Sequence, residues 1–302
     1  SGYVDKLCFE LNKVDPGWVV YNGGDWNKLM YCLSLVPQMK IVLWMPDIPN
    51  EFPKYVNDLK GMNPKMLLVT SKNNRRIEKQ YSPQELIARM LATKSNLMLE
   101  FGDDSGLIVA TIWDALGNVF GYKLHNVNDV AMVLTRRLNE LQSYTRVGSR
   151  SIGAAKPVPD EKKFFEIGRQ YAEVFHDLIH GGGTTRFLGN MSFRCSEGFP
   201  SFRKDGLVYV SKRNIDKRKI DKDSFVAVEL EGDGVQFYGD TKPSVDTPIQ
   251  LRLYREIPTA RYMLHSHCMI ADCPMTDSVI PCGALEEAEE ILSVWHRTGG
   301  VL

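Results

Sequence analysis

The apolar segments of this chain are short, and this limits its possible folds more than any other feature. Within the 302 residues, the longest candidates are residues 39–45 and 65–69, which have the length of β-strands. A bilayer-spanning helix needs about 18–20 consecutive apolar residues, so we predict no membrane segment. The first residues lack the basic stretch and apolar core of a secretory signal, so we predict a cytoplasmic protein.

Composition narrows the possible partners without indicating an activity. Hydrophobic residues make up 43% of the chain, which at 302 residues is enough to form the cores of two domains. Lys plus Arg equals Asp plus Glu at 37 each, which argues against nucleic acid or anionic lipid as a partner. The six cysteines form no CxxC pair and are too sparse for a disulfide scaffold, so we predict reduced thiols.

In the first half, strand-length apolar runs alternate with amphipathic segments. The predicted strands are residues 18–21, 40–45, 65–70, 96–101, 107–114 and 119–124. The predicted helices are residues 26–35, 83–91 and 128–141. Strands separated by helices favour βαβ crossovers and parallel pairs, so we predict an α/β fold with a Rossmann-like domain of unassigned role over residues 1–145.

Small, basic and Pro-bearing residues follow over residues 146–160, and we interpret this segment as a linker. The second half then opens with a helix over residues 160–180 and becomes strand-dominated. Its predicted strands are residues 187–194, 206–211, 224–229 and 260–265, and its further helices are residues 247–254 and 285–295.

Two loops of the first half resemble anion sites only weakly. Gly23 and Gly24 lie between a predicted strand and a predicted helix, where backbone N–H groups can bind phosphate. The pattern is not GxGxxG, however, and Asp25 would repel phosphate, so we interpret it as an ordinary turn. Residues 71–76 are interpreted as a solvated loop for similar reasons.

The most informative cluster is His265-Ser266-His267 at the end of a predicted strand. Residues two apart on a strand point to one face, and two neutral imidazoles can bind a divalent transition metal. Two buried polar histidines are the alternative. Upstream, Ser244 and the following N–H groups could hold an anion, and Asp246 could be a metal ligand or a proton acceptor.

Three motifs together resemble the class II aldolase/adducin family: Gly189-Asn190-x-Ser192-x-Arg194, Lys242-Pro243-Ser244-x-Asp246-Thr247-Pro248, and His265-x-His267. The resemblance covers about residues 161–302 and is greatest to the sugar-phosphate aldolase and 4-epimerase branch. It implies a class II aldolase-like α/β/α domain with a mainly antiparallel sheet. It also implies a homo-oligomer.

The resemblance further implies zinc, or another divalent transition metal, bound by His265 and His267. The ion would polarise a substrate carbonyl and stabilise an enediolate, with Asp246 as the catalytic residue. The family's phosphate-binding positions correspond here to Gly189, Asn190, Ser244 and Val245. We add Ser192 and Arg194 to the candidate substrate-binding residues, because the same strand offers their hydroxyl and guanidinium groups.

The sequence departs from the family in three respects, one of which is a short tract between His267 and the Glu-rich helix that contains Cys268, Cys273 and Cys282. Family members supply a third histidine after a strand that would correspond to residues 299–302, where this sequence ends; His296 is a substitute in principle. A Thr-Gly or Ser-Gly pair is replaced by Ser211-Lys212-Arg213. Lys212 and Arg213 could bind phosphate by charge. Alternatively, they belong to a solvated basic face with the neighbouring residues Lys217, Arg218 and Lys219.

Three hypotheses follow. The first is a divalent-metal-dependent lyase or epimerase acting on a small phosphorylated sugar through an enediolate or retro-aldol step. The second is an adducin-like, non-catalytic interaction module. The third is a nucleotide-binding protein whose activity resides in the first half.

Overall fold

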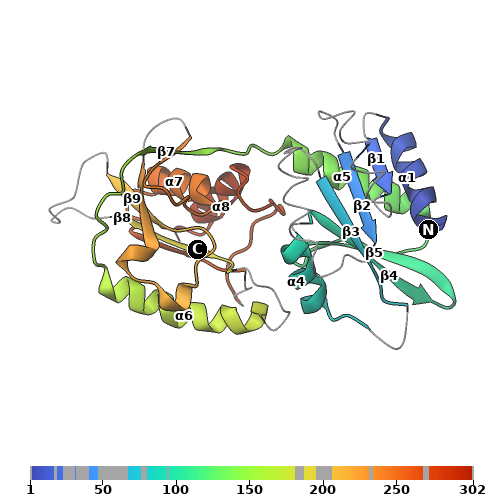
Figure 1. Ribbon diagram of the computed structural model, residues 1–302, viewed down its shortest axis with the longest axis horizontal. Helices are drawn as coiled ribbons and strands as arrows, with labels where there is room; N and C mark the ends of the chain where they lie inside the picture. The colour runs from blue at the N-terminus through green and yellow to red at the C-terminus, as the bar shows by residue number, and fades with distance from the viewer. Residues whose placement is uncertain are drawn as a thin grey trace. The chain divides into compact units, whose positions relative to one another are not determined.

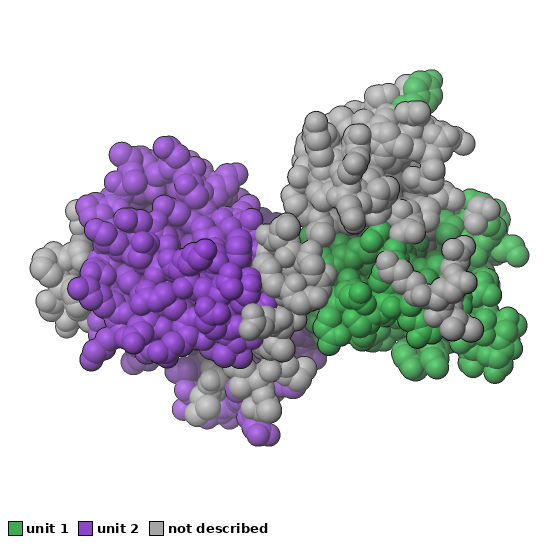
Figure 2. All heavy atoms as spheres, turned by 60° about the horizontal axis from the view of Figure 1, so that its bottom comes forward, with its two compact units in different colours: residues 1–142, 179–185 green, residues 143–178, 186–302 purple. Residues whose placement is uncertain are grey.

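The computed structural model describes most of the chain and divides it into two compact units (Figure 2). The described residues are 2–16, 19–22, 31, 41–46, 67–75, 80–93, 95–180, 187–194, 206–230, 234–267 and 272–300. Unit 1 comprises residues 1–142 and 179–185, and unit 2 comprises residues 143–178 and 186–302. Each unit contains its own six-stranded sheet, so the fold is mixed α/β. No helix in the described ranges is long and apolar enough to cross a bilayer.

The sheet of unit 1 follows the chain without reversal (Figure 1). Its strands are β1 (Val19–Asn22), β2 (Ile41–Pro46), β3 (Leu67–Asn73), β4 (Leu97–Asp104), β5 (Leu107–Asp114) and β6 (Val119–Leu124). The first four are parallel, which confirms the predicted parallel pairs, and the last two pairings are antiparallel. A Rossmann fold reverses its strand order at a switch point. The described strands show no such reversal, so their order is not that of the Rossmann-like domain that we predicted.

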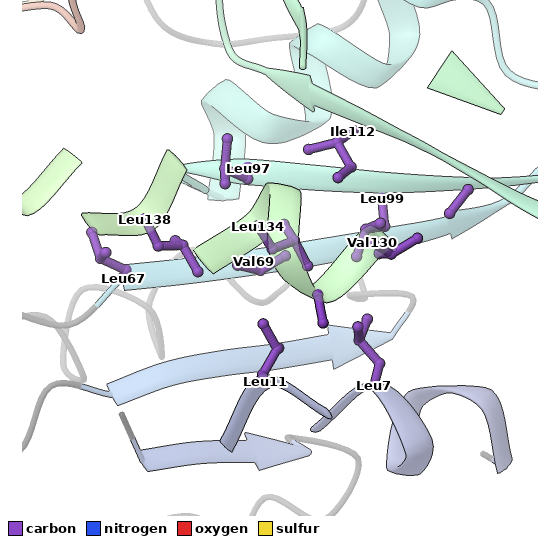
Figure 3. Close-up of a cluster of buried hydrophobic side chains, with 12 residues drawn as sticks. Leu7, Leu11, Leu67, Val69, Leu97, Leu99, Ile112, Val130, Leu134 and Leu138 are labelled. Carbon is purple, nitrogen blue, oxygen red and sulfur yellow. The ribbon is translucent and has the colours of Figure 1, made fainter. Parts of the chain in front are cut away.

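Helices cover both faces of this sheet. On one face, α1 (Gly2–Val14) and α5 (Val127–Ser143) bury leucines against alternate residues of β3 and β4, as Figure 3 shows. On the other face, α4 (Pro83–Thr93) places Leu86 and Met90 on Met98. The predicted start of α4 is confirmed by a capping box, in which Glu85 N–H donates to Ser82 Oγ and Ser82 N–H donates to Glu85 Oε2.

Some sequence-based predictions for unit 1 had a different outcome. Helix α1 was not predicted, although Leu7 and Leu11 are buried at the spacing of one helical turn. The predicted helix over residues 26–35 and the turn at Gly23 and Gly24 lie outside the described residues, apart from the single position Tyr31.

The sheet of unit 2 has the order β12-β8-β9-β10-β11-β7. Its strands are β7 (Ser149–Gly153), β8 (Asn190–Arg194), β9 (Leu207–Ser211), β10 (Phe225–Glu229), β11 (Val235–Tyr238) and β12 (Tyr262–His265). All neighbouring strands are antiparallel except β11 and β7, which are parallel. Two 3-10 turns, Lys217–Lys219 and Lys222–Ser224, lie between β9 and β10.

Helices again lie on opposite faces of this second sheet (Figure 1). Helix α6 (Lys162–His180) packs Phe165 edge-to-face against Phe193 and stacks it on Phe225. The opposite face is covered by α7 (Thr247–Glu256), whose Leu251 and Tyr254 pack on valines of β9 and β10. Helix α8 (Glu286–Arg297) packs against α7. The face that α7 covers carries the motifs singled out above.

The segment that we interpreted as a linker contains part of this sheet. Residues 149–153 form the edge strand β7, which pairs with β11 in unit 2. Most side chains of β7 are exposed, so the strand contributes through its backbone and has no apolar pattern in the sequence. All of residues 146–160 therefore fall within the second unit.

The core of unit 1 yields a stability prediction. Replacing Leu134 by Ala removes a fully buried side chain from the cluster formed by α5 and the sheet, so the free energy of unfolding should fall by about 2–5 kcal/mol. Met132 lies on the same helix but is 52% exposed, so Met132→Ala should cost much less. Urea denaturation of both variants measures the difference, and equal losses would contradict the packing described here.

Candidate functional site

A cross-strand pair brings two of the three motifs together. His265 of β12 lies directly opposite Asn190 of β8 in the antiparallel register. Side chains of opposed residues share one face of a sheet. Ser266 points toward the other face, because its Oγ lies 3.1 Å from the Tyr171 hydroxyl on α6. His265 and Asn190 therefore face α7 together.

The Asn190 amide links this pair to the third motif. Its Nδ2 donates to Asp246 Oδ2 over 2.8 Å, and its Oδ1 accepts a hydrogen bond from Gln250 Nε2. All three residues are buried. Asp246 directly precedes α7 and Gln250 lies one turn later, so both reach the sheet from one side of the helix. The three motifs therefore converge on one buried cluster.

Sequence reasoning missed Gln250. Its spacing of four residues from Asp246 was the available signal, since that spacing places two polar groups on one face of the predicted helix. Its Nε2 holds the Asn190 oxygen, which leaves the Asn190 nitrogen to face Asp246. Gln250 thus determines which way the Asn190 amide is turned.

Three buried polar atoms of the cluster have no hydrogen-bond partner in the described part of the chain: Nε2 of His265, Oδ1 of Asp246 and Oε1 of Gln250. Buried polar atoms are usually satisfied, so unsatisfied ones call for a partner such as water, an ion or a ligand. The imidazole of His267 is also close, with its centroid 5.1 Å from that of His265 and an interplanar angle of 83°. The two imidazoles are groups of the kind that binds a divalent transition metal.

Within the described ranges, no group of three or more His, Cys, Asp and Glu residues could hold a metal ion. His296, which we considered as a substitute ligand, is exposed on α8 and joins no such group. The described residues thus supply a partial donor set, and the third ligand predicted from the resemblance is not among them.

The electrostatic surroundings of His265 favour a neutral imidazole. Burial lowers the pKa of His265, the Asp246 carboxylate opposes this by raising it, and the Lys217 ammonium lowers it further. Neutral imidazole is the form that binds a metal. The alternative interpretation of residues 212–219 as a solvated basic face is wrong for Lys217, which is 3% exposed and donates from Nζ to the Phe187 carbonyl over 3.0 Å.

The end of β9 lies beside the turn that precedes α7. Arg213 N–H donates to the Lys242 carbonyl over 3.0 Å, and Ser244 N–H donates to the Ser211 carbonyl over 3.1 Å. The Lys212 ammonium donates to the Asp223 carbonyl over 2.5 Å, whereas the Arg213 side chain is exposed. The predicted phosphate-binding segments are therefore adjacent.

Two further predicted site residues flank the cluster. Gly189 has a φ of +74°, in the left-handed region that favours glycine, and this conformation leads the chain into Asn190. Val245 is 49% exposed beside the half-buried Ser244. Ser244 also stabilises the turn, because its carbonyl accepts a hydrogen bond from Thr247 Oγ1 over 2.6 Å.

Ser192 and Arg194 lie away from the cluster, contrary to our interpretation of them as substrate-binding residues. Ser192 is fully buried, with its Oγ 3.1 Å from the Tyr254 hydroxyl. The Arg194 guanidinium donates to four carbonyls at the end of α7: those of Tyr254, Ile257, Pro258 and Ala260. Asn190, Ser192 and Arg194 lie at successive positions along α7, from its start to its end. Only Asn190 therefore reaches Asp246.

Comparison with known proteins supports the resemblance in this half of the chain. Residues 169–286 match the family model described as the Class II Aldolase and Adducin N-terminal domain. The resemblance inferred from the three motifs is thereby confirmed. The matched segment includes Asn190, Asp246 and both histidines.

One solved structure is also similar to the chain. It is the crystal structure of YgbL from Escherichia coli, described as "a putative aldolase/epimerase/decarboxylase". The match has 16% sequence identity, covers 44% of this chain and 70% of that chain, and has a TM-score of 0.30. The assignment of the class II aldolase/adducin segment therefore rests on the family model.

The position of Arg194 yields a prediction that separates a structural from a binding role. Arg194→Met removes the donors at the end of α7 and should lower the free energy of unfolding by about 2–3 kcal/mol, because partly buried carbonyls lose charged partners. Arg297→Met should cost at most about 1 kcal/mol, since Arg297 forms an exposed ion pair with Asp277. Thermal and urea unfolding compare the two, and equal stabilities would restore Arg194 as a candidate substrate-binding residue.

Proposed function

We propose that unit 2 is a divalent-metal-dependent lyase or epimerase that acts on a small phosphorylated sugar. The observation that carries this proposal is the convergence of two unsatisfied buried atoms, His265 Nε2 and Asp246 Oδ1, around the Asn190 amide. A metal ligand and a proton acceptor side by side are the parts needed to break a bond next to a carbonyl. The family model supports this class of chemistry.

His265 and His267 would hold the divalent ion, with zinc as the expected metal, and a third ligand would come from outside the described residues. When bound, such an ion supplies Lewis acidity toward a substrate carbonyl. The protein's own contribution is to keep His265 neutral and turned toward Asn190 and α7.

Asp246 would accept a proton from the substrate. One of its carboxylate oxygens is held by Asn190, and the other is buried with no hydrogen-bond partner among the described residues. Asn190 is itself held by Gln250, so the orientation of the acceptor oxygen is set before substrate binds. Because this orientation is already fixed, less ordering is needed to reach the transition state, and the barrier to proton transfer is lower.

The sugar's phosphate would bind between the end of β9 and the start of α7. Backbone N–H groups at a helix N-terminus favour anions, and Ser244 and Val245 lie at this end of α7. Gly189 and the side chains of Lys212 and Arg213 complete the proposed anion site. Lys217 adds a buried positive charge close to His265.

An adducin-like, non-catalytic module remains the second candidate. It is favoured by the lack of a complete metal-binding group among the described residues, since two histidines alone make a weak metal site. A homo-oligomeric state and a cytoplasmic location also remain predictions. Zinc binding separates the two functions.

We expect the full chain to bind zinc, and His265→Ala or His267→Ala should weaken binding on the order of 100-fold or more because each removes an imidazole ligand. Asp246→Asn should retain zinc yet abolish turnover of small phosphorylated sugars, assayed by NMR detection of new products. His125→Ala in unit 1 is the matched control for loss of a histidine. Isothermal titration calorimetry measures zinc affinity; a wild-type chain that binds no zinc would favour the adducin-like module.

The anion site has its own prediction. Arg213→Gln should raise the Kd for inorganic phosphate by about fivefold, because the exposed Arg213 guanidinium is available to an anion. Lys212→Gln should have a smaller effect, since its ammonium already binds the Asp223 carbonyl. Lys219→Gln is the control, because Lys219 lies in the same basic run near Asp216. If all three variants bind phosphate like the wild type, the anion lies elsewhere.

A further inference from the structure

Two charged residues that interact electrostatically with Asp246 lie outside the segment matched by the family model. Arg146 precedes β7, and Glu287 lies in the first turn of α8, whereas the matched segment runs from residue 169 to residue 286. The negative charge of Asp246 acts to raise the pKa of both residues. Arg146 and Glu287 therefore share the electrostatic environment of Asp246. The site thus contains ionisable groups that the matched segment does not supply.

Close packing brings the start of α8 against the turn that carries Asp246. Gly283 adopts a φ of +75°, and a Cβ placed there would lie 3.2 Å from the Val245 carbonyl oxygen and 3.3 Å from Arg146 Nη1. The Arg146 guanidinium also donates to the Cys282 carbonyl, and Arg146 forms a β-bridge with Ala284. Glu287 follows one turn later, with its N–H donating to the Ala284 carbonyl over 3.2 Å.

Glu286 and Glu287 are neighbours in sequence but have opposite environments. Both carboxylate oxygens of Glu286 accept the Thr145 N–H, at 2.9 and 3.1 Å. Burial alone would raise the pKa of Glu286, but these hydrogen bonds and Arg146 bring it below its usual value. The pKa of Glu287 is raised to about 8, because burial and the charge of Asp246 both raise it and Arg146 only partly opposes them.

We propose that Glu287 is a second acid–base group of the site, delivered from α8 to the side of Asp246, and that it donates a proton where Asp246 accepts one. Two carboxyl groups in different surroundings can take opposite roles in this way. The inference rests on the function proposed above and extends it, because it adds the proton donor that the three motifs lack.

The proton count of such a step balances. In a retro-aldol cleavage, Asp246 takes the proton of the substrate hydroxyl, and the carbon that carried this hydroxyl becomes a new carbonyl. The C–C bond breaks, and its electron pair passes to the fragment that held the original carbonyl, which becomes an enediolate. Glu287 then gives its proton to that fragment. The two carboxyl groups hold one proton before and after the step, and exchange with water returns it from Asp246 to Glu287.

The test is a pH titration of glutamate carboxyl groups by carbon NMR on the full chain with labelled glutamate, without metal or substrate. We expect one resonance with a midpoint of about 8, which disappears in Glu287→Gln and persists in the neighbouring control Glu286→Gln. Asp246→Asn should move this midpoint to lower pH, because it removes the negative charge that disfavours ionisation of Glu287.

The inference is overturned if no glutamate titrates above its usual range, or if Asp246→Asn leaves the midpoint unchanged. The second outcome would show that Glu287 is merely buried and not coupled to the site. If Glu287→Gln does not fold, as judged by circular dichroism, Glu287→Asp supplies the assignment, because the same glutamate resonance disappears from the labelled sample. Failure of the wild-type chain to bind zinc would instead contradict the proposed function. Zinc binding is measured separately, by isothermal titration calorimetry.

Discussion

The candidate site depends on the hydrogen bond between the Asn190 amide and the Asp246 carboxylate. Asn190 is paired across strands with His265, so this one side chain connects β12, β8 and the start of α7. An asparagine can serve two partners of opposite kind, because it has both a donor and an acceptor end. Gln250 occupies the acceptor end, and the donor end therefore remains directed at Asp246. Without this orientation, Asn190 would not connect the strand pair that holds His265 to the carboxylate of Asp246.

Sequence periodicity predicted the regular elements well where a side-chain pattern exists. Helix α4 begins at Pro83 behind its capping serine, and β6 spans residues 119–124 as expected. The edge strand β7 was not predicted, because an edge strand is held by backbone hydrogen bonds and needs no apolar pattern. The interior strand β11 was also missed, because its alternation of buried Val235 and Phe237 spans only four residues. Strand order could not be predicted for the same kind of reason: it depends on contacts between distant segments, and the local pattern of β1–β4 suits a Rossmann order as well as the sequential one observed.

At the site, spacing predicted which residues share a face but not how far along it they lie. Asn190, Ser192 and Arg194 alternate on β8, so all three face α7, as expected for a strand. A strand rises about 3.3 Å per residue, so Arg194 lies about 13 Å beyond Asn190 and meets the end of the helix, not its start. Lys217 shows the converse error. A run of basic residues predicted solvent exposure, yet one member of it is buried near His265.

The contrast between Glu286 and Glu287 shows why ionisable groups are the hardest part of a site to predict from sequence. The two residues have the same side chain and successive positions on α8, yet one carboxylate is held by backbone N–H groups and the other is held by none in the described chain. The difference arises because a helix rotates successive residues by about 100°, which turns Glu286 toward Thr145 and Glu287 into a separate environment where the charge of Asp246 acts on it. An acidic run at the start of a helix is usually explained by the helix dipole alone. Here the dipole accounts for neither environment, because each is set by residues more than 40 positions away in the sequence.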